Sequence, residues 1–161
     1  MNMDGLAIAR ALHVLGVVIW IGGVAMVTVV IIPAVKSFKL PQDRVHFFEA
    51  VEHRFSWIAR AATLIVGSTG FYMVWQLDLW SRFADPFFWW MHAMVAVWAI
   101  FTIVLFIAEP LFLRRHFAKR AREAPESTFA FVQRIHWVLL GISLITIMGA
   151  VAGAHGFSWL N

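Results

Sequence analysis

Seven histidines stand in a chain of 161 residues that has no cysteine. An imidazole is costly in an apolar environment unless a hydrogen bond, a metal or a cofactor compensates it. Without thiolates, the chain cannot form disulfides, thiolate metal sites, iron–sulfur clusters or a covalent CxxCH cofactor attachment. Imidazole ligation is therefore the first chemistry to consider. Five histidines fall within or beside long apolar stretches: His13, His53, His92, His136 and His155.

Two other ligand sets compete with these imidazoles. His46, Glu49 and His53 fall at i, i+3 and i+7 in VHFFEAVEHRF, on one helix face, and Glu109 is expected at the same side of the membrane. Mixed carboxylate and imidazole ligands suit zinc or iron, although a solvated face explains this amphipathic segment as well. Methionines are soft donors for Cu(I), although core filling also explains scattered ones. They are Met26, Met73, Met91, Met94 and Met148.

Composition indicates an integral membrane protein. The chain is 61% hydrophobic and 14% charged, with a mean hydropathy of +0.78, whereas soluble domains are about 45–50% apolar and about 25% charged. The pI of about 10.4 and the net charge of +4 do not indicate nucleic acid binding, because the basic residues lie between apolar stretches.

Four apolar stretches are each longer than the roughly 20 helical residues that cross a bilayer. Lipid offers the backbone no hydrogen-bond partner, so each is expected to be a helix. Short connections then predict an all-α, integral membrane antiparallel four-helix bundle in a single domain, 1–161. The first stretch is interpreted as a span rather than a removable signal peptide. The expected spans are 6–35, 55–77, 87–113 and 129–157.

Three prolines refine these elements. Pro41 and Pro125 are expected in the first turns of the second and fourth helices, which would then begin outside the hydrocarbon. Pro110 lies near the end of the third span and is expected to kink it.

The distribution of Lys and Arg predicts the topology. Eleven of the thirteen basic residues lie in segments 36–60 and 114–134, which fall on one side of an up-and-down bundle. The positive-inside rule makes that side cytoplasmic and places both termini on the periplasmic side of a bacterial inner membrane. An outer aromatic belt is expected from Trp75, Trp80, Trp89, Trp90 and Trp159.

Depth sorts the histidines into two groups, at a rise of about 1.5 Å per residue. His13, His92 and His155 fall in the outer half, and His53 and His136 in the inner half. The first and third helices are diagonal partners, as are the second and fourth, so His13/His92 and His53/His136 could each ligate one haem iron. One or two b-type haems are therefore expected, with His155 as a further candidate ligand.

Small and basic residues near these histidines extend the hypothesis. Arg10, Arg54, Arg60 and Arg134 lie within about two turns of a histidine and could pair with haem propionates. Glycines could make room for a flat macrocycle, although close helix packing through small residues explains them equally well. They are Gly16, Gly22, Gly23, Gly67, Gly70, Gly141, Gly149 and Gly153.

The segment IARALHVLGVVIWIGG, residues 8–23, resembles the first helix of a superfamily of small membrane proteins. That superfamily contains CopD-like copper-resistance domains and the HemJ-type protoporphyrinogen oxidases. Leu12, His13, Trp20 and Gly22 or Gly23 match its motif, in which the histidine is implicated as a haem or metal ligand. FWWMHAMVAVW, with His92, looks like the start of the oxidase family's third helix.

The chain departs from the oxidase pattern at Met94, where that family has a lysine, and in VQRIHWVLLG, which replaces an NEVPT-like segment. His136 in that segment makes the chain look more like a four-helix b-type cytochrome. We therefore expect a haem b protein that transfers electrons, with a quinone or a redox protein as partner. The alternatives are an oxidase-like enzyme, a copper-handling protein and a structural subunit. Catalytic residues are not assigned, and homo-oligomerisation stays open.

Overall fold

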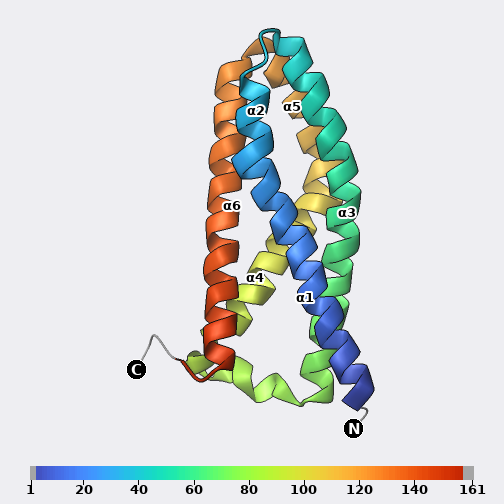
Figure 1. Ribbon diagram of the computed structural model, residues 1–161, viewed down its shortest axis with the longest axis vertical. Helices are drawn as coiled ribbons and strands as arrows, with labels where there is room; N and C mark the ends of the chain where they lie inside the picture. Colours follow the sequence, from blue (N-terminus) through green and yellow to red (C-terminus); the bar gives the residue numbers. More distant parts are fainter. Residues whose placement is uncertain (1–2, 158–161) are drawn as a thin grey trace.

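The computed structural model describes residues 3–157, without the side chains of Pro41 and Arg114. Trp159 of the expected aromatic belt lies outside the described residues. Within those residues the chain is helical and contains no strand, which confirms the all-α prediction. Figure 1 shows the chain rising, returning, rising and returning again. Its principal helices are α1 (Met3–Met26), α2 (Ile32–Lys36), α3 (Pro41–Gln76), α4 (Trp89–Ile103), α5 (Arg114–Glu123) and α6 (Pro125–Ala154).

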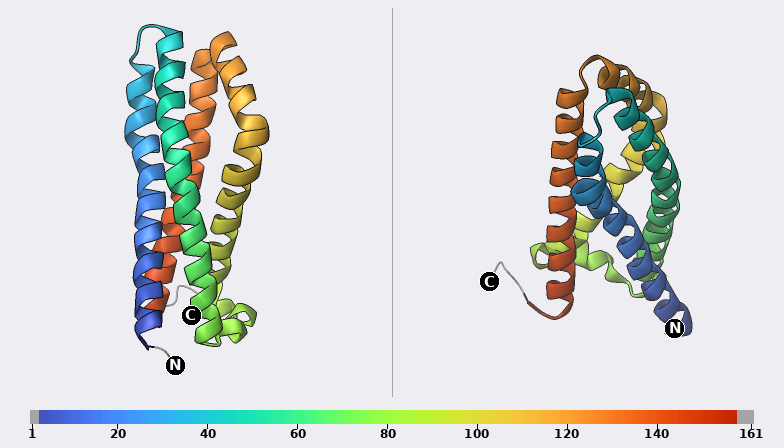
Figure 2. Two further views of the ribbon diagram at one scale, coloured as in Figure 1. Left: turned by 90° about the vertical axis from the view of Figure 1, so that its right-hand side faces the viewer. Right: turned by 45° about the horizontal axis from the view of Figure 1, so that its top comes forward.

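The two ends of the molecule differ in what connects the helices (Figures 1 and 2). At one end, which we call the basic end, α2 turns into α3 through residues 37–40 and α5 turns into α6 at Ala124. At the opposite, terminal end lie both described chain ends and the link from α3 to α4. That link contains two 3₁₀ helices, η2 (Leu79–Ala84) and η3 (Pro86–Phe88).

Four helical stretches are long and apolar enough to cross a membrane. The second begins well before the predicted residue 55, because the amphipathic segment that follows Pro41 continues the same helix. Pro41 and Pro125 lie in the first turns of α3 and α6, as predicted. The candidate spans are Met3–Lys36, Gln42–Gln76, Pro86–Leu113 and Pro125–Ala154.

The interior is a packed apolar core. α1 packs along α3, and α4 packs along α6. In the middle of the molecule, Trp20 and Phe101 meet edge to face with their ring centroids 4.9 Å apart, and Leu140 joins them from α6. A second cluster, around Phe48 and Phe129, fills the basic end. Many large apolar side chains remain exposed on the outer faces, a distribution typical of membrane-spanning helices.

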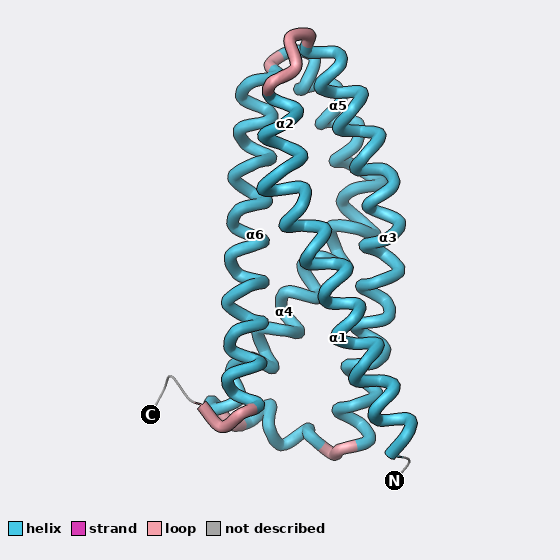
Figure 3. The backbone as a smooth tube through the Cα atoms, in the orientation of Figure 1, coloured by secondary structure: helices cyan, strands magenta, loops and turns pink. Residues whose placement is uncertain are grey.

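Two wide helical turns interrupt the α-helical hydrogen bonding. Both are π-helical: η1 (Val27–Ile31), which joins α1 to α2, and η4 (Val104–Leu113), which joins α4 to α5. Figure 3 shows the helical path continuing through both without a loop. In a π-helix each N–H donates to the carbonyl five residues earlier, as the N–H of Ile32 does to the carbonyl of Val27.

A proline removes one donor at each wide turn, because proline has no N–H. Pro110 lies within η4, and Pro33 lies in the first turn of α2, directly after η1. The carbonyl five residues before Pro33 belongs to Thr28, and the one five residues before Pro110 belongs to Leu105. Each receives a side-chain donor from another long helix. Gln133 Nε2 of α6 donates to the Thr28 carbonyl at 2.6 Å, and Arg60 Nε of α3 donates to the Leu105 carbonyl at 2.9 Å.

We predict that Gln133 and Pro33 are energetically coupled. Gln133→Leu is expected to lower the free energy of unfolding by about 1–3 kcal/mol, because the Thr28 carbonyl loses its donor. In a Pro33→Ala background residue 33 supplies an N–H of its own, so the same change should cost less. Unfolding of the four variants in detergent measures this coupling.

Gln76→Leu is the matched control, because Gln76 is exposed at the terminal end of α3. It is expected to change the free energy of unfolding by no more than about 0.5 kcal/mol. An equal cost of Gln133→Leu in both backgrounds would show that the amide does not replace the missing N–H.

Candidate imidazole ligand site

The structure separates the histidines by burial. Only His13 and His136 are partly buried, and the other five are exposed. On α1, His13 continues the buried stripe that runs through Leu6, Ala9 and Gly16. On α6, His136 stands seven residues after Phe129 and four before Leu140, both of which are buried. The two inward imidazoles therefore come from helices at opposite ends of the chain. The exposed histidines are His46, His53, His92, His116 and His155.

His13 is held against α3 by one ring nitrogen. Its Nδ1 lies 3.1 Å from the carbonyl oxygen of Val66 and 3.1 Å from Thr69 Oγ1. The ring also packs on Gly70, where an added Cβ would come within 3.2 Å of the imidazole. A larger residue at position 70 would therefore crowd the imidazole.

These contacts define the neutral form of the His13 ring. The Val66 carbonyl can only accept, and the Thr69 hydroxyl donates its proton to the Ile65 carbonyl at 2.6 Å. Nδ1 must therefore carry the proton, which leaves the lone pair on Nε2. Metal-ligating histidines commonly have this arrangement, with the other ring N–H donated to a carbonyl or similar acceptor that orients the ring.

His136 has the same chemistry with a local acceptor. Its Nδ1 donates to the carbonyl of Val132, one turn earlier in α6, at 2.9 Å. In the neutral ring Nε2 again holds the lone pair. In both partly buried imidazoles Nδ1 is therefore hydrogen-bonded, and in the neutral ring Nε2 holds the lone pair.

The other predicted ligands occupy different surroundings. His92 is exposed. On α4 it lies about 100° around the helix from the buried Met91, on the side away from Trp90. Its ring meets the Phe83 ring edge to face, with the ring centroids 5.4 Å apart. The contacts of His13 therefore come from α3, whereas the ring contact of His92 comes from η2. His53 is exposed on α3. His155 is exposed, and its Nδ1 donates to the Val151 carbonyl at 2.8 Å.

Phe and Trp rings pack against four of the eight glycines named in the sequence analysis. An added Cβ at Gly67 would come within 2.7 Å of the Trp98 indole, and one at Gly149 within 2.5 Å of Trp89. Gly153 faces Trp90 and Gly23 faces Phe55 in the same way. Glycines at these four positions serve close packing rather than a slot for a macrocycle. These four glycines therefore provide no open space for a flat macrocycle.

Arg10, Arg54 and Arg134 are exposed, so their guanidinium groups are accessible to an anionic group such as a propionate. Arg60 has a different role. Its Nη2 donates to Glu109 Oε2 at 3.2 Å, and its Cζ lies 5.0 Å from the centroid of the Trp57 ring. Its side chain is 16% exposed and that of Glu109 is 5% exposed.

The mixed carboxylate and imidazole ligand set does not assemble. Among the residues that the structure describes, no three His, Asp or Glu side chains converge as ligands for an ion. Glu109 faces Arg60, and His46 and His53 are exposed. Of the methionines, Met26 and Met148 are 52% and 61% exposed, whereas Met91 is 7% exposed.

The ion pair of Arg60 with Glu109 was not identified from the sequence, although a signal was present. Both are ionisable residues inside predicted apolar spans, each four or five residues from the same end. Intramembrane charges usually pair with one another and mark functional positions. Pro33 carried a second signal, because a proline inside an apolar span leaves a carbonyl that another helix must satisfy.

Comparisons with models of known families, with curated proteins and with solved structures found no match. Two neutral imidazoles facing inward can ligate a metal or a haem iron, and the buried ion pair holds η4 against α3.

We predict that Arg60→Leu lowers the free energy of unfolding by about 3–5 kcal/mol, because it removes the cation facing a buried carboxylate. Combining it with Glu109→Leu should restore part of that loss. Arg54→Leu, an exposed position on the same helix, should have little effect. Unfolding in detergent provides the measurement, and equal losses for Arg60→Leu and Arg54→Leu would contradict the prediction.

Proposed function

We propose that the chain is an integral membrane antiparallel four-helix bundle of the bacterial inner membrane, with both termini on the periplasmic side. Four apolar helices of sufficient length support this proposal, as do the exposed apolar side chains on their outer faces. The connections that carry most of the Lys and Arg residues lie together at the basic end (Figure 1). Under the positive-inside rule, that end is cytoplasmic.

Single cysteines test this topology, because the chain has none of its own. Ser37 and Ser81 are both exposed, at the basic and terminal ends respectively. A membrane-impermeant maleimide applied to cells with a permeabilised outer membrane should label Ser81→Cys. It should label Ser37→Cys only after lysis. The opposite pattern would invert the proposed topology.

We further propose that the bundle binds haem b with His13 as an axial ligand and transfers electrons, to or from a quinone or a redox protein. The observation that carries this proposal is the pair of contacts from His13 Nδ1 to Val66 and Thr69. They leave the lone pair of the neutral ring on Nε2, where it can coordinate iron. The bound haem would supply reversible one-electron chemistry. The resemblance of residues 8–23 to haem- and metal-binding membrane proteins adds support.

Other side chains complete this proposal. His136 is the strongest candidate for a further ligand, since it is the second inward imidazole. His53 and His92 remain candidates from the sequence, and His155 is a weaker one. Arg10, Arg54 and Arg134 are accessible partners for propionates. The protein would orient the imidazoles through the hydrogen bonds of their Nδ1 atoms. Its apolar core would exclude water.

We predict that protein produced with a haem precursor has a Soret band that shifts on reduction. His13→Ala should abolish or strongly reduce the haem content per chain. His116→Ala should retain the wild-type content, because His116 is an exposed histidine whose Nδ1 donates to the Phe112 carbonyl. Thr69→Val should weaken haem binding about 10–100-fold through loss of one acceptor of Nδ1, and Thr69→Ser should restore it.

The controls separate the alternatives. Thr102→Val removes a hydroxyl that donates to the Trp98 carbonyl, and it should leave the spectrum unchanged. Colourless wild-type protein loaded with copper would favour the copper-handling alternative. Rescue of a strain that lacks protoporphyrinogen oxidase would favour the oxidase. Colourless, metal-free wild-type protein would contradict both the haem and the copper proposals.

A further inference from the structure

A hollow of about 660 Å³ opens at the basic end, between the start of α3 and the end of α5. Gln42, Val45 and His46 line it from α3, where their i, i+3 and i+4 spacing places them on one helix face. Arg122 lines it from α5, and Leu40 from the preceding connection. Val45 is 3% exposed and forms an apolar floor, whereas the other four lining residues are exposed.

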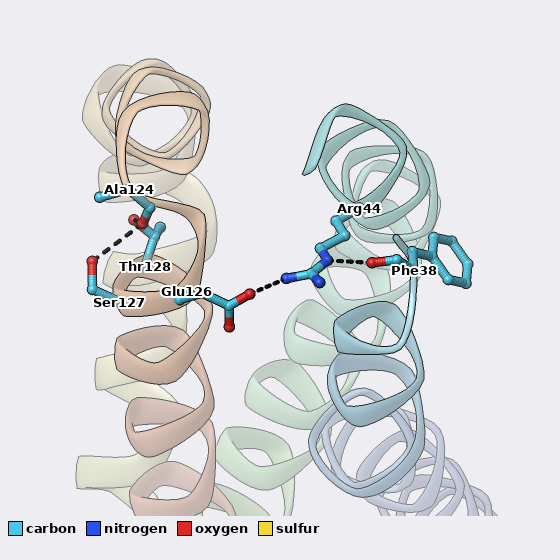
Figure 4. Close-up of polar contacts among 6 residues, drawn as sticks. All are labelled: Phe38, Arg44, Ala124, Glu126, Ser127 and Thr128. Atoms are coloured by element: carbon cyan, nitrogen blue, oxygen red, sulfur yellow. Dashed lines mark hydrogen bonds and ion pairs between the residues drawn. The ribbon is translucent and has the colours of Figure 1, made fainter. Parts of the chain in front are cut away.

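The polar side chains of this hollow are available to a ligand. Among the described residues, the side chains of His46 and Arg122 make no hydrogen bond or ion pair. The neighbouring Arg44 is already used, as Figure 4 shows: it pairs with Glu126 of α6 and donates from Nε to the Phe38 carbonyl at 2.7 Å. The Arg122 guanidinium, the His46 imidazole and the Gln42 amide therefore line the hollow without a hydrogen bond to another described residue.

The charge around the hollow favours an anion. In α5, RRHFAKRARE, the inner positions Phe117 and Ala121 pack against Phe48 and Phe129. The outer positions are mostly cationic, with exposed Arg115, Lys119, Arg120 and Arg122. The acids nearest in sequence to the lining residues are Asp43 and Glu123, so the cations are in excess. Such basic pockets at the cytoplasmic ends of membrane helices bind anionic headgroups.

We propose that this hollow binds the phosphate headgroup of an anionic phospholipid. A lipid is favoured over a soluble phosphate because apolar side chains line the hollow beside its polar groups, with Val45 as the floor and Leu40 52% exposed. Acyl chains can cover these side chains while Arg122 and His46 bind the phosphate. The inference rests on the proposed membrane location of the chain and not on haem binding.

The test compares the full chain in nanodiscs of phosphatidylcholine alone with the chain in nanodiscs that also contain phosphatidylglycerol. Retention of phosphatidylglycerol by the purified protein, measured by native mass spectrometry, reports binding. Arg122→Gln should weaken retention about fivefold, the equivalent of about 1 kcal/mol for one cation. His46→Gln should weaken it as well. Arg120→Gln is the matched control, since it removes the same charge from the same helix outside the hollow.

Each outcome decides the proposal. A loss for Arg122→Gln and His46→Gln, but not for Arg120→Gln, supports a lipid phosphate site in this hollow. Equal losses for Arg122→Gln and Arg120→Gln would show attraction by net charge alone and overturn it. No preference for phosphatidylglycerol would also overturn it. Displacement of the retained lipid by inorganic phosphate would reassign the site to a soluble phosphate and overturn the lipid assignment. The haem content of the same samples reports the proposed function separately.

Discussion

The need to satisfy every backbone carbonyl away from water governs this structure. Pro33 and Pro110 each remove an N–H from a helix that is otherwise apolar, and each leaves a carbonyl without its helical donor. The wide turns η1 and η4 shift the affected carbonyl to Thr28 and Leu105. Side chains from α6 and α3 then donate to those oxygens at 2.6 Å and 2.9 Å. The two carbonyls that the prolines leave without a donor thus form hydrogen bonds between helices.

The same requirement explains the use of polar groups within the bundle. Gln133 and Arg60 donate hydrogen bonds to backbone carbonyl oxygens, and Arg60 also donates to the Glu109 carboxylate. Buried threonines turn their hydroxyls to carbonyls of their own helices, as Thr28 does to Val24 at 2.6 Å. The two partly buried imidazoles differ from these groups, because the hydrogen bonds of His13 and His136 use only Nδ1 and leave the lone pair of the neutral ring on Nε2.

The sequence predicts the helices better than it predicts which faces they present. Apolar length identified the four spans, and Pro41 and Pro125 identified the true starts of α3 and α6. Depth placed His13 and His92 in the same half of the bundle, but depth carries no information about rotation. His92 lies outside the buried face of α4 because Trp90, Met91 and Val97 occupy that face. The glycines could not be interpreted without knowing that Trp89, Trp90 and Trp98 would cover three of them.

The π-helical turns also set the rotational phase of the helices that contain them. A π turn holds one residue more than an α turn without adding a full step of rise, so residues on either side no longer follow one 3.6-residue repeat. The first span therefore contains two different repeats. One places His13 toward α3, and the other buries Ile32 and Val35. Loss of one residue from η1 would bring the two repeats into phase, because the remaining residues could then form one continuous α-helix. The π turn at 27–31 therefore lets both stripes face the interior although they do not share one α-helical repeat.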